Sequence, residues 1–230
     1  MVNSWPDLRQ IDAVIFDMDG TLVDSMPYWR ILPENWFRER HLPVPEDLDV
    51  QLGMVDLWQA SELLAERYSS SSETAEQVYA VLGETMTRHY AEDIPLMPYA
   101  LEFLQQLAAA HIPACIATMT DRPQVETVLE THNIGGFFQF VLTTPEVGQG
   151  KDQPEIFLEA ARRFGTKPGR TLVFEDSRTA LVTALNAGFP AVCMRNAACD
   201  YTELDRLKAG LNAKLWYLDD FSPLLHIAKN

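Results

Sequence analysis

Two aspartates, Asp17 and Asp19, stand two residues apart at the end of an apolar run. Packing gains nothing from two like charges at that place, because charged side chains are rarely buried without a partner. A second acidic pair, Glu175 and Asp176, follows another apolar run far along the chain. Clustered carboxylates repel one another unless a cation neutralises them, and several hard oxygen ligands suit Mg²⁺. The pattern therefore predicts a magnesium site and chemistry that uses carboxylates.

These acids need a scaffold that brings distant segments together. Short apolar runs without alternation predict strands buried on both faces of a parallel sheet. The runs are residues 13–16, 114–117, 140–142, 172–174 and 191–194, with a possible edge strand at 214–218. Helical periodicity lies between them, in residues 101–108, 123–132, 154–164 and 177–187. Strands alternating with helices predict an α/β fold with a doubly wound parallel sheet and right-handed crossovers.

Residues 26–94 break this alternation. They contain no convincing strand pattern, while their apolar residues recur at helical spacing. The sequence therefore predicts a small all-helical cap inserted after the first strand, with the α/β core formed by residues 1–25 and 95–230. Pro27 on one side, and Pro95 and Pro98 on the other, stiffen the two connections. Such connections suit hinges, so we expect the cap to move as a lid.

The predicted strands place several polar residues at one edge of the sheet. In open α/β sheets, ligands bind outside the carboxyl ends of the strands. The residues that directly follow the strands there are Asp17, Thr118, Thr143, Glu175 and Asp176. Lys151 lies in the loop after the third strand, just before a helix whose early Pro154 marks its start. We expect these carboxylates, hydroxyls and amine to form one site.

Four segments carry a family resemblance. They are Asp17-Met18-Asp19-Gly20-Thr21, Thr118 after a strand, Gly150-Lys151-Asp152-Gln153-Pro154, and Phe174-Glu175-Asp176-Ser177. In this order they resemble the four signatures of the haloacid dehalogenase-like hydrolase superfamily. The place of the insert resembles the helical-cap subgroup, which includes phosphoglycolate phosphatase and β-phosphoglucomutase. Two departures, Asp152 where proline is commoner and Ala180 where glycine is frequent, touch no catalytic group.

The resemblance implies roles for four catalytic residues. Asp17 would attack phosphorus and form an aspartyl phosphate, which splits one difficult transfer into two steps. Asp19 would protonate the leaving oxygen and then take a proton from the attacking water. Thr118 and Lys151 would hold the phosphoryl oxygens, where fixed donors stabilise the charge of the transition state.

The resemblance also implies a metal site and a substrate site. Mg²⁺ would rest on Asp17 and Asp176 and on the backbone carbonyl of Asp19, with Glu175 as either a direct or a water-mediated partner. The substrate is expected to be a small phosphorylated metabolite, such as a sugar phosphate. Four residues are candidates for contacts with it: Gly20, Thr21, Met119 and the cap residue Arg30.

Other reactions of the superfamily fit the residues less well. A dehalogenase needs neither a second aspartate nor Mg²⁺, and a phosphonatase needs a cap lysine, whereas the first lysine of this chain is Lys151. β-Phosphoglucomutases carry a histidine where this chain has Trp29, and often a valine where it has Thr21. A regulator or binding module would require a broken catalytic set. We therefore predict a magnesium-dependent phosphatase, with a β-phosphoglucomutase-like phosphomutase as the alternative.

Composition restricts the setting of this chemistry. The net charge of −15 and pI near 4.6 disfavour nucleic acid and anionic membranes as partners. No apolar run approaches the roughly 20 residues of a membrane span, and residues 1–10 lack the pattern of a signal peptide. We expect a cytoplasmic protein that is a monomer or a weak homodimer. Cys115 and Cys193 lie in apolar stretches and are expected to be core residues without a redox role.

Overall fold

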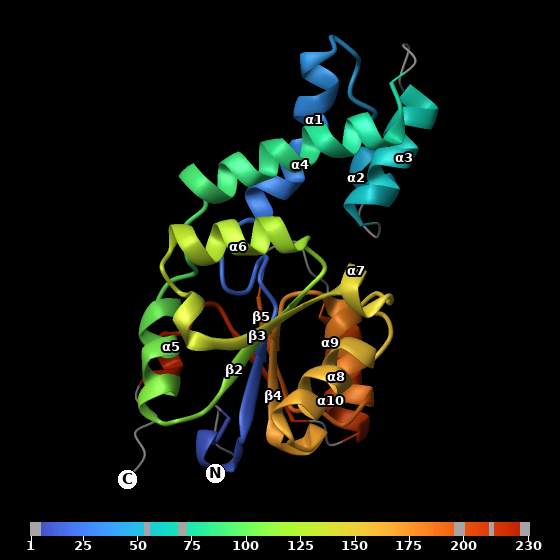
Figure 1. Ribbon diagram of the computed structural model, residues 1–230. Helices are drawn as coiled ribbons and strands as arrows, with labels where there is room; N and C mark the ends of the chain where they lie inside the picture. Colours follow the sequence, from blue (N-terminus) through green and yellow to red (C-terminus); the bar gives the residue numbers. More distant parts are fainter. Residues whose placement is uncertain (1–5, 53–55, 69–72, 196–200, 212–213, 226–230) are drawn as a thin grey trace. The chain divides into compact units, whose positions relative to one another are not determined.

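The protein divides into two compact units. The computed structural model describes residues 6–52, 56–68, 73–195, 201–211 and 214–225. One unit, the core, comprises Met1–Asp24 and Pro95–Asn230, and the other, the cap, comprises Ser25–Ile94. Figure 1 shows both. The expected domains, residues 1–25 with 95–230 and 26–94, stay a prediction, because a compact unit need not fold on its own.

The described part of the core forms a six-stranded sheet in the order β3-β2-β1-β4-β5-β6, and every neighbouring pair is parallel. The strands are β1 (Ala13–Phe16), β2 (Ala114–Thr118), β3 (Phe138–Thr143), β4 (Thr171–Glu175), β5 (Ala191–Met194) and β6 (Leu215–Leu218). The chain builds outward from β1 to β3 and then returns to the other side of β1. The expected doubly wound sheet is confirmed, and its winding direction reverses between β1 and β4, which is where such sheets bind ligands.

Helices connect the strands. They are α5 (Ala100–Ala109), α6 (Arg122–Thr131), α7 (Thr144–Val147), α8 (Glu155–Phe164), α9 (Arg178–Asn186) and α10 (Thr202–Leu211). Short 3₁₀ turns span Leu8–Gln10, Gly135–Phe137, Pro168–Arg170 and Ser222–Leu224. The sequence analysis did not predict α7 and α10. Nowhere in the described residues is a helix both long enough and apolar enough to cross a membrane.

Alternate residues of the central strands face opposite layers of the core. Ile15 joins a cluster of buried residues from α8 and α9. Phe16 faces the other layer, where it stacks on Phe174 at 4.9 Å between ring centroids and contacts Phe103 of α5. Phe221 closes this aromatic group, 5.3 Å from Phe103. In Figure 1, α5 accordingly lies on one side of the sheet and α8 and α9 on the other. Because both faces of the sheet are buried, the residues of these strands form continuous apolar runs in the sequence.

The described residues of the cap contain helices and no strand. The helices are α1 (Met26–Glu39), α2 (Leu48–Leu52), α3 (Leu57–Tyr68) and α4 (Ala75–Glu92). Helix α4 packs against α1 and α3. Their shared core buries Leu32, Trp36, Phe37, Leu64, Val78, Leu82 and Met86. The apolar residues at helical spacing therefore form a separate hydrophobic core for the cap.

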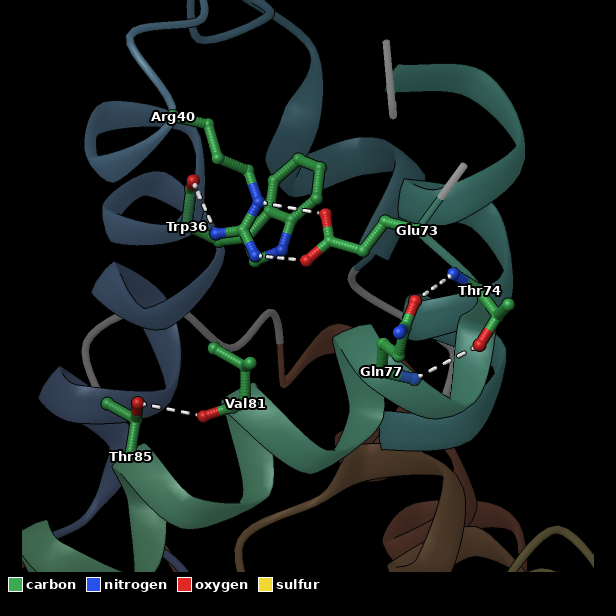
Figure 2. Close-up of polar contacts among 7 residues, drawn as sticks. All are labelled: Trp36, Arg40, Glu73, Thr74, Gln77, Val81 and Thr85. Atoms are coloured by element: carbon green, nitrogen blue, oxygen red, sulfur yellow. Dashed lines mark hydrogen bonds and ion pairs between the residues drawn. The ribbon is translucent and has the colours of Figure 1, made fainter. Parts of the chain in front are cut away.

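Polar contacts tie the end of α1 to the start of α4 (Figure 2). Arg40 donates from Nη2 and Nε to the two carboxylate oxygens of Glu73, at 2.6 and 3.1 Å. The same guanidinium lies over the ring of Trp36, 4.4 Å from its centroid. Thr74 and Gln77 form a reciprocal capping box at the first turn of α4. These contacts fix where α4 begins relative to α1.

The two cysteines expected in the core are buried there. Cys115 in β2 and Cys193 in β5 are fully buried, and neither forms a disulfide bond with another described residue. Burial raises the pKa of the Cys115 thiol, which keeps it protonated and unreactive. Cys199 lies outside the described residues.

Candidate active site

The two acidic motifs meet at the point where the sheet reverses its winding. Phe16, the last residue of β1, is paired with Phe174 of β4. One residue further, the N–H of Asp17 donates to the carbonyl of Phe174 at 2.9 Å and extends the ladder between the two strands. Glu175 is the last residue of β4, and Asp176 follows it. The parallel register thus brings acids that are far apart in the sequence to neighbouring positions.

Asp17, Glu175 and Asp176 form a buried acidic cluster. A carboxylate oxygen of each lies within 4.8 Å of one from both others, and their exposed fractions are 6%, 1% and 7%. Burial raises the pKa of Asp17 well above its ordinary range. The positive charge of Lys151 opposes this shift in pKa, and the neighbouring carboxylates add to it. A buried site that offers only oxygen donors and excess negative charge fits a hard cation such as Mg²⁺.

Lys151 neutralises part of this charge. Its Nζ donates to Asp17 Oδ1 and, at 2.6 Å, to Glu175 Oε1, and its side chain is 4% exposed. Burial alone would lower the pKa of the lysine, but the attraction of Asp17 and Glu175 outweighs burial and raises it. The other oxygen of Glu175 accepts the N–H of Ser177 at 2.7 Å. Both oxygens of Glu175 therefore have partners within the protein.

A tight turn after β1 positions Asp19. The carbonyl of Met18 accepts the N–H groups of Leu22, at 2.8 Å, and Val23, at 3.1 Å. Gly20 within this turn has a φ of +71°, in the left-handed region that glycine adopts without strain. The turn holds Asp19 beside the end of β1, where its side chain is half-buried.

Three consecutive residues at the end of β2 complete the described site. The hydroxyl of Thr118, which is buried, accepts the N–H of Thr120 at 3.1 Å. The hydroxyl of Thr120 donates to Asp19 Oδ2 at 2.6 Å. Met119, between them, is 45% exposed. Thr143 at the end of β3 is the register partner of Thr118. The sequence analysis did not single out Thr120, although its place three residues after the predicted strand end was a signal that could have found it.

The predicted site residues take different places in the structure. Four of them lie in one cluster: Asp17, Lys151, Glu175 and Asp176. Asp19 and Thr118 are linked through Thr120. Thr21 is fully buried, and its hydroxyl has no hydrogen-bond partner among the described residues. Its side chain is therefore not presented to a substrate in this conformation. Arg30 is exposed on α1 of the cap. The roles expected for these residues stay predictions.

The fold is of the α/β class with an open parallel sheet, and the acidic cluster lies at the carboxyl ends of its strands, where such sheets bind ligands. The family model of the haloacid dehalogenase-like hydrolases matches residues 11–188, and the chain belongs to this family. The family resemblance of its four motifs is thereby confirmed.

Several curated relatives are phosphatases. The chain is 29% identical to (DL)-glycerol-3-phosphatase 2 of Arabidopsis thaliana over 85% of its length and 84% of the relative. It is 28% identical to phosphoglycolate phosphatase of Escherichia coli, over 83% of the chain and 82% of that enzyme.

Solved structures share the fold. CbbY from Rhodobacter sphaeroides, in complex with phosphate, superposes with a TM-score of 0.76 at 21% identity and covers 93% of this chain and 96% of its own. β-Phosphoglucomutase from Clostridium difficile gives a TM-score of 0.67 at 20% identity, with 93% of each chain covered. At these identities the likeness concerns the fold.

Proposed function

We propose that the protein is a magnesium-dependent phosphatase, which hydrolyses the phosphate monoester of a small metabolite through an aspartyl phosphate on Asp17. The observation that carries the proposal is the buried Asp17 carboxylate, held by Lys151 beside the acidic pair Glu175 and Asp176. Membership of the hydrolase family and the phosphatases among its relatives support the same reaction. A sugar phosphate or a similar metabolite is the substrate class we propose.

In the first step, a carboxylate oxygen of Asp17 attacks phosphorus in line with the leaving group. The new bond joins that oxygen to phosphorus, and the bond from phosphorus to the ester oxygen breaks. Asp19 gives its proton to the departing oxygen, so an alcohol leaves. Lys151 and the hydroxyl of Thr118 face the charge of the transferring phosphoryl group, where fixed donors are most effective.

In the second step, water attacks the phosphorus of the aspartyl phosphate. Asp19, now ionised, takes the proton of that water as a general base. The bond from phosphorus to the Asp17 oxygen breaks, so inorganic phosphate leaves and the Asp17 carboxylate is restored. Asp19 ends the cycle protonated, as it began.

The acidic cluster fits the metal that this chemistry needs. Asp17 and Asp176 would hold Mg²⁺, together with the backbone carbonyl of Asp19. Glu175 is the weaker candidate for a direct ligand, because its oxygens accept from Lys151 and Ser177. Bound there, Mg²⁺ supplies positive charge that screens the nucleophile from an anionic substrate.

One observation favours a phosphatase over the phosphomutase alternative. The indole N–H of Trp29, which stands where the resembling mutases have a histidine, donates to the hydroxyl of Tyr90 at 3.1 Å within the cap. Indole has a donor and no acceptor, so it cannot relay a proton to a sugar. We therefore expect free phosphate rather than glucose 6-phosphate from β-glucose 1-phosphate, even with the bisphosphate activator present. A coupled glucose 6-phosphate assay beside a phosphate assay distinguishes the two.

A screen of phosphorylated metabolites with Mg²⁺ tests the proposal, with released phosphate as the readout. We expect at least one efficient substrate, no turnover in EDTA, and a loss of at least about a thousandfold in Asp17→Asn. Asp12→Asn is the matched control, because Asp12 precedes the opposite end of the same strand and is exposed. Full activity of Asp17→Asn, or full activity in EDTA, contradicts the proposal.

A further inference from the structure

Thr120 connects two parts of the site that are far apart in the sequence, since Thr120 itself lies 101 positions after Asp19. Its backbone N–H donates to the hydroxyl of Thr118, and its own hydroxyl donates to Asp19 Oδ2 at 2.6 Å. The residue is 8% exposed and lies between the end of β2 and the start of α6. A single residue therefore links the strand end that carries Thr118 to the turn that carries Asp19.

The contact with Asp19 restricts the motion of that carboxylate. The last side-chain torsion of an aspartate has a broad preference, so a half-buried carboxylate is poorly oriented by its own rotamer. At 2.6 Å, the contact between the Thr120 hydroxyl and Asp19 Oδ2 lies at the short end of the range for O–H···O hydrogen bonds. Thr120 is itself β-branched, which limits its rotamers, and its backbone is fixed through Thr118. The bond therefore holds the Asp19 carboxyl group in place relative to the end of β2.

We propose that Thr120 is a positioning residue, whose hydroxyl orients the Asp19 carboxylate for proton transfer to the leaving oxygen and from the attacking water. The inference rests on the proposed function. Thr120 transfers no proton in this scheme, and the group that reacts is Asp19.

This role predicts that the effect of removing the Thr120 hydroxyl on kcat/KM depends on the leaving group of the substrate. An alkoxide leaves poorly without a proton, so its departure depends on a well-oriented Asp19, whereas p-nitrophenolate leaves without that proton. The ratio kcat/KM reports the steps up to departure of the leaving group. Loss of the Thr120 hydroxyl should therefore lower kcat/KM for an alkyl phosphate much more than for p-nitrophenyl phosphate. A defect in folding or in phosphate binding would lower both values together.

The experiment compares Thr120→Val and Thr120→Ser with the wild-type enzyme in Mg²⁺, using p-nitrophenyl phosphate and the best alkyl phosphate from the metabolite screen. Thr127→Val is the matched control, since the hydroxyl of Thr127 makes an exposed hydrogen bond within α6, to the backbone carbonyl of Pro123 at 3.0 Å. A well-placed acid or base contributes roughly 10²–10⁴ in rate. We expect Thr120→Val to lose about 10-fold or more with the alkyl phosphate, mainly in kcat, and less than about threefold with the aryl phosphate.

We expect Thr120→Ser, which keeps the hydroxyl, and Thr127→Val to keep the wild-type ratio of the two kcat/KM values. In an Asp19→Asn background, Thr120→Val should cause no further change in that ratio, because the two residues act through one contact. If Thr120→Val does not fold, Thr120→Ala removes the same hydroxyl without the extra methyl group.

The outcomes separate this inference from the proposed function. An equal loss with both substrates, or an unchanged ratio in folded Thr120→Val, overturns the positioning role while the phosphatase stands. Failure of the wild-type enzyme to release phosphate, or full activity of Asp17→Asn, overturns the proposed function itself.

Discussion

One amine faces three buried carboxylates at the end of β1 and β4. Lys151 contacts Asp17 and Glu175, and Asp176 lies in the same cluster. The pKa of Asp17 is raised by burial, with smaller contributions from its acidic neighbours. The carboxylates of the cluster therefore repel one another, and a bound cation reduces this repulsion. At the scale of single residues, we therefore expect Lys151 to stabilise the folded state, in addition to its proposed contact with the transferring phosphoryl group.

Lys151→Met tests this double role, because it keeps the length of the side chain and removes its charge. We expect a loss of about 3 kcal/mol in the free energy of unfolding in EDTA, the order found when one partner of a buried ion pair is removed. Mg²⁺ should restore part of the loss, because it binds the folded state. The deficit should also shrink as the pH falls, since the folded state already raises the pKa of Asp17 and protonation removes the repulsion.

Denaturant unfolding with Mg²⁺ or EDTA, at several pH values, measures these differences. Lys167→Met, a change at an exposed lysine, is the matched control. Equal stability of Lys151→Met and the wild-type protein in EDTA would show that the cluster is not strained by its charge.

At the residue scale, the sequence predicted which residues lie at the site but not which of their side chains contact one another. Asp17, Glu175 and Asp176 were predictable, because a polar residue directly after a buried strand must lie at the sheet edge. The contacts of Glu175 with Lys151 and Ser177 depend on side-chain directions that spacing does not define. The hydrogen bond between Thr120 and Asp19 depends on the pairing of β1 with β2, so no local sequence pattern predicts it.

At the scale of elements, the ion pair of Arg40 and Glu73 connects the end of α1 to the start of α4. This ion pair predicts how the stability of the protein depends on pH. The hydrogen bonds from Arg40 lower the pKa of Glu73, so the pair stabilises the fold above the unfolded pKa of about 4.3 and less as the pH falls below it. We expect Glu73→Gln to lose about 1–2 kcal/mol at neutral pH and to approach wild-type stability near pH 3.

Denaturant unfolding followed by tryptophan fluorescence measures this loss, because the buried Trp36 lies beneath Arg40. Glu84→Gln, on an exposed position of α4, is the control for removing one carboxylate from the cap. A pH-independent difference between Glu73→Gln and the wild-type protein would contradict an electrostatic origin.

Sequence predicted long or fully buried elements better than short or exposed ones. The apolar runs of β1 and β5 are buried along their whole length, and the predicted ends match the structure. β3 begins at Phe138, two residues before the predicted start, because this edge strand is partly exposed and its pattern is mixed. Helix α7 has four residues, too few to show a helical period.

At the scale of the whole molecule, the two connections to the cap lie side by side on the core. Asp24 donates its N–H to the carbonyl of Pro95 at 3.0 Å, and Val23 pairs with Leu96 in an antiparallel bridge. The ends of the core that flank the insertion are therefore already adjacent. A short linker can close the core without distorting it.

Replacing residues 25–94 with a short Gly-Ser linker tests whether the core folds alone. We expect cooperative unfolding and α/β circular dichroism, since the sheet, its aromatic layer and the acidic cluster all lie in the core. Hydrolysis of p-nitrophenyl phosphate should persist, while kcat/KM for the preferred metabolite should fall by about 10-fold or more, because the substrate contact that we expect from Arg30 is removed. A core that remains unfolded would show that the two units form a single folding unit.

The most direct test of the central claim is to identify the residue that carries the phosphoryl group during turnover. Asp19→Asn lacks the base that hydrolyses the intermediate, whereas p-nitrophenyl phosphate can still transfer its phosphoryl group without an acid. After mixing with this substrate and Mg²⁺ and quenching in acid, peptide mass spectrometry should find one phosphoryl group on Asp17, at higher occupancy than in the wild-type enzyme. Absence of phosphate from Asp17 in an Asp19→Asn enzyme that releases p-nitrophenol, or its presence on another residue, would contradict the account.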